Sequence, residues 1–420
     1  MSRLIALVFS LGAVVACGPA NRNGGGGGGG GGGDGGGGGG CVDNDGDGYT
    51  TCDGDCCDDP TQCSNPAVVN PGAYDVPGDG VDNDCDGTID NAPAACDQGL
   101  ASNSNAGLDF AKAIELCQTT TMQDKKWGVL SAQLTKADGS ALDSGQSVQH
   151  SIRPHYGTGT TPKAGSSLIE LSTGNAAATA DTNPGPDQDE DGEFFASSDF
   201  PSDWYAANGS TLPNAPGCPA SDPLSQAGDP VMLTLTIRVP TNAQSFTLDV
   251  NFFSSEFPEW TCSPYNDFFV VLLDSMFQGT GMTANPADKN IAVYIDSAMK
   301  TYPVGVNLAS GNTGLFTQCK NGTVGCAPGS TQGSINTCTG TTDLAGTGME
   351  LTDPNGGCTG DTELGGGTGW LTTTGNVVPG EIMKLRIAIW DTSDDALDSL
   401  AVIDNFQWQA TTSTPGTVIQ

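Results

Sequence analysis

The chain has few basic residues and almost no histidine. Its 420 residues include 49 acidic side chains, 14 Lys and Arg together and 2 His, which gives a formal net charge of −35. A surface this acidic repels a phosphate backbone, so nucleic acid is excluded as a partner. His150 and His155 stand five residues apart around Pro154, a poor spacing for a helical metal pair or a catalytic triad. The motifs G-x-S-x-G, H-E-x-x-H and the P-loop are absent from the sequence.

Long apolar runs are also missing beyond the first residues. The longest is Phe268–Leu273, far too short to span a bilayer. At the N-terminus Arg3 precedes the apolar stretch Leu4–Val15, which predicts a signal peptide over residues 1–16. Its end, Val14-Val15-Ala16-Cys17, resembles a bacterial lipobox. The resemblance implies export, lipid on Cys17 and, with Gly18 next, anchoring to the outer membrane; an ordinary cleaved signal is the alternative.

A glycine tract follows the predicted lipid site. Residues 24–40 are glycine except for Asp34, and such a composition gives a flexible coil. We therefore expect residues 17–40 to form a tether that lifts the remaining chain away from the membrane.

Residues 41–90 contain thirteen Asp but no Lys, Arg, His or Glu. So many carboxylates without a counter-charge repel one another, and the few apolar residues cannot bury enough surface to compensate. The stretch therefore either stays unfolded or folds around a cation. Its spacing favours a cation, because it contains the pattern D-x-D-x-D-G twice. In this pattern the carboxylates at positions 1, 3 and 5 and the carbonyl group at position 7 converge on a hard ion.

The two loops define the predicted metal ligands. In the first they are Asp43, Asp45, Asp47, the carbonyl of Tyr49, and Asp53 or Asp55; in the second, Asp82, Asp84, Asp86, the carbonyl of Thr88, Asp90 and Asp79. Neither loop has the flanking helices of an EF-hand. Oxygen ligands without His or Met favour calcium over copper. The alternatives are a solvated acidic linker and a zinc site near Cys56 and Cys57.

The same stretch is similar to two known patterns. Closely spaced acids with interspersed cysteines resemble the calcium loops of thrombospondin type 3 repeats. The stretch more closely resembles a metal-binding motif of bacterial surface proteins related to a methanotroph copper-binding protein. The matching pieces are Asp45–Tyr49, Asp55–Pro60, Asn70–Asp75 and Gly80–Asp90. We name residues 41–95 the Asp-rich segment.

The cysteines agree with export to an oxidising compartment. Of fifteen, Cys17 is the predicted lipid site, eight lie between Cys41 and Cys117, and six lie between Cys218 and Cys358. An even number in each group suits disulfides. We expect Cys96 to pair with Cys117 around a short helix, and Cys319 to pair with Cys326 across a small loop.

Residues 96–412 predict a mainly β head, preceded by the small, irregular Asp-rich segment and followed by a tail at 413–420. Apolar residues alternate with polar ones at 233–239, 246–252, 291–295 and 385–389. This period and the Gly-, Asn- and Pro-rich intervals are typical of an antiparallel, jelly-roll-like β-sandwich with long loops. One helix is expected after an Asp109 cap. Residues 305–376 are expected to form a disulfide-pinned loop.

Several blocks of this head resemble the choice-of-anchor L domain of bacterial surface proteins. They are Phe110–Ile114, Phe252–Glu259, Tyr265–Phe269, Ile389–Asp391 with Asp394 and Asp398-Ser399, and Asp404–Phe406. The resemblance implies an exported all-β module attached to the envelope, without an established activity.

Acidic and amide side chains gather in two loops of the head. Glu256, Glu259, Asn266 and Asp267 lie between two predicted strands, and Asp391, Asp394 and Asp398 lie between two others. If these loops meet, they form an oxygen cage for calcium, which would pin the loops or bridge to a glycan hydroxyl; the alternative is that the acids cap turns and face water. A third D-x-D-x-D-G occurs at Asp187, Asp189 and Asp191.

The sequence therefore favours a calcium-binding, lipid-anchored surface protein that binds an extracellular glycan or an envelope protein without catalysis. One alternative is an envelope-attached hydrolase, in which Glu256 and Glu259 act as a glycosidase-like pair. Another is a metal-capture protein, which lacks the soft ligands that copper prefers.

Overall fold

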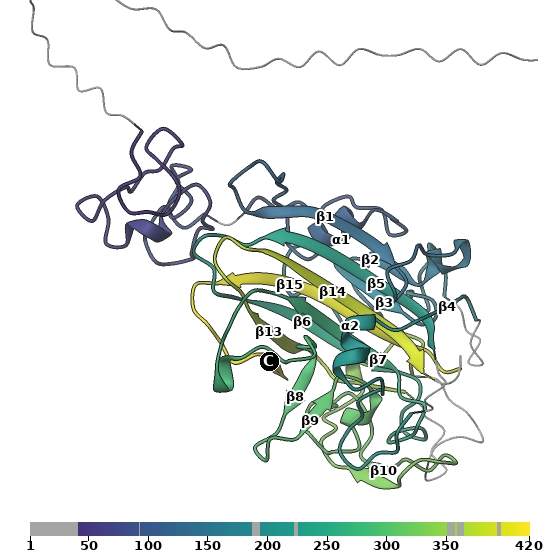
Figure 1. The fold of residues 1–420 in the computed structure, drawn as a ribbon. Coiled ribbons are helices and arrows are strands. Elements are labelled where there is room, and N and C mark those ends of the chain that lie inside the picture. The colour runs from purple at the N-terminus through teal and green to yellow at the C-terminus, as the bar shows by residue number, and fades with distance from the viewer. Residues whose placement is uncertain are drawn as a thin grey trace, which may run out of the picture. The chain divides into compact units, whose positions relative to one another are not determined.

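The alternating segments form two antiparallel sheets in the computed structural model (Figure 1). The first has the order β1-β5-β14-β7, with β4 paired to β5. Its strands are β1 (Gly128–Thr135), β4 (Ser197–Ser198), β5 (Ala227–Arg238), β7 (Phe268–Asp274) and β14 (Ile382–Thr392). The second has the order β16-β13-β6-β15-β3-β2, with β12 paired to β6. Its strands are β2 (His150–Arg153), β3 (Leu168–Ser172), β6 (Ser245–Ser254), β12 (Gly366–Gly367), β13 (Leu371–Asn376), β15 (Ser399–Gln409) and β16 (Gly416–Ile419).

The structure describes residues 41–91, 93–186, 194–221, 226–350, 358, 365–392 and 396–420. The predicted signal peptide, Cys17 and the tether lie outside these residues, as do Asp394 and the third loop with Asp187, Asp189 and Asp191. None of the helices in the described ranges has the length and apolar character that a membrane crossing requires.

The main core lies between the two sheets, and it explains the alternation in the sequence. Inward-facing residues of β5 and β14 pack with those of β6 and β15 in one buried cluster. The register sets Ile387 of β14 beside Leu233 of β5 and Val271 of β7. The alternating strands thus pack in the aligned manner of a β-sandwich, and the predicted fold class is confirmed.

Strand β7 shows why the run Phe268–Leu273 does not alternate. Phe269, Val271 and Leu273 face the main core. The intervening Phe268, Val270 and Leu272 pack on the outer face, where Trp204 of α2 (Ser202–Ala207) and Trp390 cover them. A strand that is buried on both faces needs apolar residues at every position.

Short elements connect the strands. The remaining helices are α1 (Gly107–Ala113) and the 3-10 turns η1 (Pro66–Val68), η2 (Ser144–Val148), η3 (Gly281–Thr283), η4 (Val306–Leu308) and η5 (Thr342–Leu344). The two small hairpins are β8 (Val293–Ile295) with β9 (Thr301–Pro303), and β10 (Gly322–Val324) with β11 (Gly333–Ile335). The expected Asp109 cap is wrong, because α1 already begins at Gly107 and Asp109 lies in its first turn, where it accepts a hydrogen bond from Ser104 Oγ (2.7 Å).

Seven disulfides pair the fourteen cysteines from Cys41 onward. Cys96 pairs with Cys117 as expected. The expected pair of Cys319 and Cys326 is wrong: the β10–β11 hairpin carries the chain back, so that Cys319 pairs with Cys338, and Cys326 pairs with Cys358. The others are Cys218–Cys262 and, in the Asp-rich segment, Cys41–Cys52, Cys56–Cys85 and Cys57–Cys63. Zinc at Cys56 and Cys57 is thereby excluded, because both thiols are oxidised.

Two predicted boundaries change. The expected tail at 413–420 contains β16, which completes an edge of the second sheet by pairing with β13. The expected loop at 305–376 contains β13 itself, which lies between β16 and β6. Both strands are short, and neither alternates apolar with polar residues over more than a few positions. The head therefore spans residues 96–420.

Candidate metal centres

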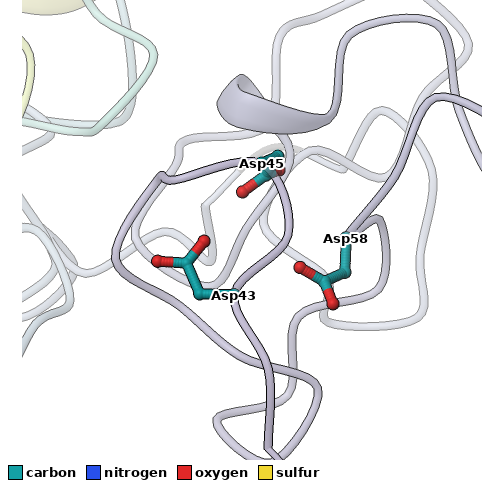
Figure 2. Close-up of side chains that lie close together, drawn as sticks. All are labelled: Asp43, Asp45 and Asp58. Carbon is teal, nitrogen blue, oxygen red and sulfur yellow. The ribbon is translucent and has the colours of Figure 1, made fainter.

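Three groups of carboxylates converge in the Asp-rich segment. Within each group, three carboxylate oxygens lie within 4.8 Å of one another. The groups are Asp43, Asp45 and Asp58; Asp45, Asp47 and Asp55; and Asp75, Asp82 and Asp84. Figure 2 shows the first group, in which Asp43 and Asp45 lie on one loop and Asp58 comes from a separate stretch of the chain. Among the described residues, every group of acids that meets this distance lies in this segment.

The first D-x-D-x-D-G loop coils because its carboxylates bond to its own backbone. Asp43 accepts hydrogen bonds from the amides of Gly46 (2.7 Å) and Gly48 (3.1 Å). Both glycines have positive φ, 81° and 91°, which side chains other than glycine rarely tolerate. Asp58, fourteen residues after Asn44 in the sequence, completes the group. The backbone amide and the side-chain amide of Asn44 donate to its two carboxylate oxygens (2.7 and 2.8 Å). Local turns and two hydrogen bonds between Asn44 and Asp58 thus fix the group.

The second group, which shares Asp45 with the first, has one unsatisfied oxygen on each member. The Oδ1 atoms of Asp45, Asp47 and Asp55 accept backbone hydrogen bonds of 3.1, 2.7 and 3.0 Å. Their Oδ2 atoms are all buried and have no hydrogen-bond partner among the described residues. Leaving a buried polar atom unpaired costs roughly 1–3 kcal/mol, and more when it is charged. One oxygen of each carboxylate lies within 4.8 Å of the others, and three clustered carboxylates that each carry an unpaired buried oxygen make an arrangement that a cation stabilises.

The pKa shifts of the second group also favour a bound cation. Burial raises the pKa of Asp47, and the nearby charges of Asp45 and Asp55 raise it further. Burial also raises the pKa of Asp55, which is only 7% exposed, and the charges of Asp45, Asp58 and Asp43 add to the effect. The ionised carboxylates are therefore unfavourable together unless a positive charge joins them.

The third group forms in the second loop. Asp75 accepts from the amides of Asn83 (2.9 Å) and Asn91 (2.6 Å), and Asp82 accepts from the amide of Gly87 (3.0 Å). Burial raises the pKa of Asp84 to about 6, and the charges of Asp86, Asp75 and Asp82 contribute.

The structure brings together six of the predicted carboxylate ligands and leaves four outside the three groups. Asp53 instead accepts from Thr50 and lies 3.3 Å from Lys125 Nζ. Asp79, Asp86 and Asp90 accept from nearby backbone amides, namely those of Val81, of Thr88, and of Gly78 with Gly80. The carbonyl groups of Tyr49 and Thr88 remain predicted ligands.

The prediction missed Asp58 and Asp75. Both lie outside the D-x-D-x-D-G repeats, so spacing alone does not reveal them. Both do fall in matching pieces of the bacterial metal-binding motif, at Asp55–Pro60 and Asn70–Asp75. Treating every acid of that motif as a candidate ligand would have found them.

The acids of the head are arranged differently. Asp391 is 1% exposed, and burial followed by the charges of Asp267, Asp398 and Asp229 raises its pKa well above the usual range. Asp267 accepts a hydrogen bond from Ser399 Oγ (2.6 Å). Glu256 and Asn266 are buried, and Glu259 is half-buried. The two predicted loops thus share an electrostatic environment, which also includes the unpredicted Asp229; calcium binding there remains a prediction.

Comparison with known proteins identifies the head. The choice-of-anchor L domain matches residues 166–406, which is more than half of the chain. The chain belongs to the choice-of-anchor L domain family. Membership indicates a cell-surface or extracellular protein, and the matched range begins just before β3 and ends within β15. The Asp-rich segment precedes the match, so its chemistry stands on its own residues. Neither the curated proteins nor the solved structures gave a match.

Proposed function

We propose that this choice-of-anchor L protein is a calcium-binding, lipid-anchored protein of the bacterial outer membrane, whose head binds an extracellular glycan or envelope protein without catalysis. The observation that carries the calcium proposal is the set of three buried, unpartnered Oδ2 atoms of Asp45, Asp47 and Asp55. Each carboxylate is already held by a backbone amide, and one oxygen of each lies within 4.8 Å of the other two.

The chemistry of the three groups selects the ion. All their members are carboxylates, which are hard ligands, and the cysteines nearby are in disulfides. Such a set suits calcium, which accepts six to eight oxygen ligands in flexible geometry. Water and the predicted carbonyl groups of Tyr49 and Thr88 would complete the coordination. Extracellular calcium modules bind in the range of roughly 10⁻⁴–10⁻³ M.

Calcium titration of the full chain by isothermal calorimetry tests this proposal. The unmodified protein should release or absorb heat with a Kd in the submillimolar to millimolar range. Asp55→Asn keeps the shape of the side chain but removes one negative charge from the second group. We expect the Kd for calcium at this group to rise about tenfold, because affinity depends on the charge of the ligands. Asp138→Asn is the matched control, since Asp138 is exposed in the head. No heat at millimolar calcium in the unmodified protein contradicts the proposal.

The anchor is tested separately. The lipobox-like sequence that ends at Cys17 supports lipidation, and Cys17→Ala should abolish both signal-peptide processing and the incorporation of labelled palmitate in a bacterial host. A mature chain that begins elsewhere than at Cys17, or that carries no lipid, contradicts this part of the proposal and leaves the calcium part intact.

A further inference from the structure

We propose that calcium fastens the Asp-rich segment to the head, so that residues Lys125, Thr241 and Asn242 of the head form a docking surface for the metal-loaded segment. The inference rests on the proposed calcium binding and adds a partner for it, namely the chain's own head. It is carried by the contacts that the metal loops make with these three residues.

Lys125 contacts the first metal loop at three points. Its Nζ donates to the carbonyl oxygen of Gly48 (2.6 Å) and lies 3.3 Å from Asp53 Oδ2. The ammonium group also lies 5.1 Å from the centre of the Tyr49 ring. Tyr49 returns the contact by donating its hydroxyl to the carbonyl of Lys125 (2.8 Å). Gly48 and Tyr49 hold positions 6 and 7 of the D-x-D-x-D-G loop, so the shape that presents them to Lys125 is the shape that gathers the carboxylates.

Thr241 and Asn242 contact the chain between the two metal loops. Thr241 donates its hydroxyl to Asn70 Oδ1 (2.7 Å) and its amide to the carbonyl of Gly72 (3.0 Å). Asn242 accepts from the amide of Tyr74 (3.0 Å) and donates to the carbonyl of Tyr74 (2.8 Å).

Both metal loops contact the stretch from Asn70 to Tyr74. Asn70 is fully buried and donates its amide to the carbonyl of Asn83, whose own amide donates to the ligand Asp75 (2.9 Å each). From the other side the Tyr49 hydroxyl packs directly on Gly72, and a Cβ at this position would collide with it. Loss of either loop's geometry therefore displaces the groups that face Thr241.

Besides these hydrogen bonds, the partly buried Tyr74 packs against the main core of the head. No disulfide joins the Asp-rich segment to the head, because its six cysteines pair among themselves. A cavity of about 240 Å³ remains between the two parts, lined by Asp53, Asp84, Lys126 and Trp127 among others. The docking contacts are mostly hydrogen bonds, each worth roughly 0.5–1.5 kcal/mol. An ion-free segment with thirteen carboxylates also repels an acidic head, whereas bound calcium reduces that repulsion.

The thermodynamic coupling between docking and calcium binding gives the decisive experiment. If docking and calcium binding favour each other, weakening the docking surface must weaken calcium binding, although these head residues are not ligands. Lys125→Met and Thr241→Val in the full chain should each raise the calcium Kd by about three- to tenfold, the factor expected for one or two lost hydrogen bonds. Lys384→Met and Thr236→Val are matched controls on the outward side of β14 and β5, and they should leave the Kd unchanged.

Hydrogen exchange on the unmodified protein supplies a second measurement that needs no variant. The Thr241 amide, which donates to Gly72, should exchange at least about tenfold more slowly in calcium than in EGTA, whereas amides in the middle of β5 should not change. Calcium binding with an unaltered Kd in both docking variants and calcium-independent exchange at Thr241 would overturn the inference and leave the proposed function standing. An absence of calcium binding in the unmodified protein would instead reject the proposed function.

Discussion

The Asp-rich segment and the head neutralise their carboxylates in different ways. In the head, Arg386 donates to Asp203 (2.9 and 2.7 Å) and Asp274 (3.1 Å), and Lys289 lies between the same two acids. The Arg386 guanidinium, with Lys289, holds the pKa of Asp203 well below its usual range. Elsewhere burial raises the pKa of Glu170 to about 8, so that this carboxyl is largely neutral at pH 7 and accepts from Ser151 (2.7 Å).

The segment contains no Lys, Arg or His, so no ion pair within it balances its carboxylates, and burial raises the pKa of Asp84 only to about 6. Its carboxylates accept hydrogen bonds from backbone amides of the same and neighbouring turns. The proposed calcium ions would balance their remaining negative charge. The comparison indicates that a large apolar core allows charge to be balanced within the chain, whereas about fifty residues with little core are expected, under the proposed function, to need an ion from outside.

The largest effect should come from removing calcium. In EGTA the Asp-rich segment should lose most of its amide protection while β5, β14 and β15 keep theirs, because only the segment lacks internal counter-charge. Hydrogen exchange read by mass spectrometry checks this on the full chain with its disulfides intact. Equal protection of the segment with and without calcium would remove the contrast between the two regions.

Breaking the charge network of the head should have the next largest effect. Arg386→Met leaves Asp203 and Asp274 with Lys289 alone. We expect a loss of about 2 kcal/mol in the free energy of unfolding, less than for a fully buried pair because Asp203 is partly exposed. The melting temperature should fall by a few degrees. The loss should be the same in calcium and in EGTA, as measured by thermal denaturation; Lys384→Met, at an exposed position, is the control.

Within the segment, two neighbouring aspartates should behave differently. Asp58 is buried and belongs to the first group, whereas Asp59 is only partly buried and bonds to Thr61 beside it. Asp58→Asn should raise the calcium Kd about tenfold, about 1.4 kcal/mol, and Asp59→Asn should change it little. Titration calorimetry of the two variants is the measurement, and equal affinities would show that the first group is not a site.

The last prediction concerns pH and tests the head alone. Burial and then the charge of Asp404 raise the pKa of Glu115 to about 9, well above its unfolded value, so the folded head holds a proton that the unfolded chain releases. Stability from this group is complete below about pH 4 and is lost as pH rises toward 9. Glu115→Gln should therefore make the decline in unfolding free energy between pH 7 and 9 shallower, by about 1–2 kcal/mol over the interval. Denaturant titrations at the two pH values test this; an unchanged slope would contradict the assignment.

Much of the sandwich was predictable, because apolar residues alternate with polar ones along parts of β5, β6 and β14 and face the main core. Strands β4 and β12 were not, since two residues carry no period and Gly366 and Gly367 carry no side chains. Strand β16 was missed for a related reason. Its place depends on pairing with β13, more than forty residues earlier in the chain.

The three carboxylate groups also contain residues that the sequence predicts and residues that it does not. The predicted ones include Asp43, Asp45 and Asp47 in the first loop and Asp82 and Asp84 in the second, where local spacing places them in the same turn. Asp58 and Asp75 reach their groups through bonds to Asn44 and Asn83, and such long-range partners have no fixed spacing. Disulfide pairing was predicted only where a short helix separates the two cysteines.

The disulfides of the Asp-rich segment also define its response to a pulling force. Between Cys41 and Cys96 the chain is shortened by the links Cys41–Cys52 and Cys56–Cys85. A load applied along the chain bypasses both enclosed loops, so only about fifteen residues can extend, or roughly 50 Å. The metal loops are largely enclosed by these links and are shielded from the tension. The segment would thus act as a stiff spacer of limited stretch.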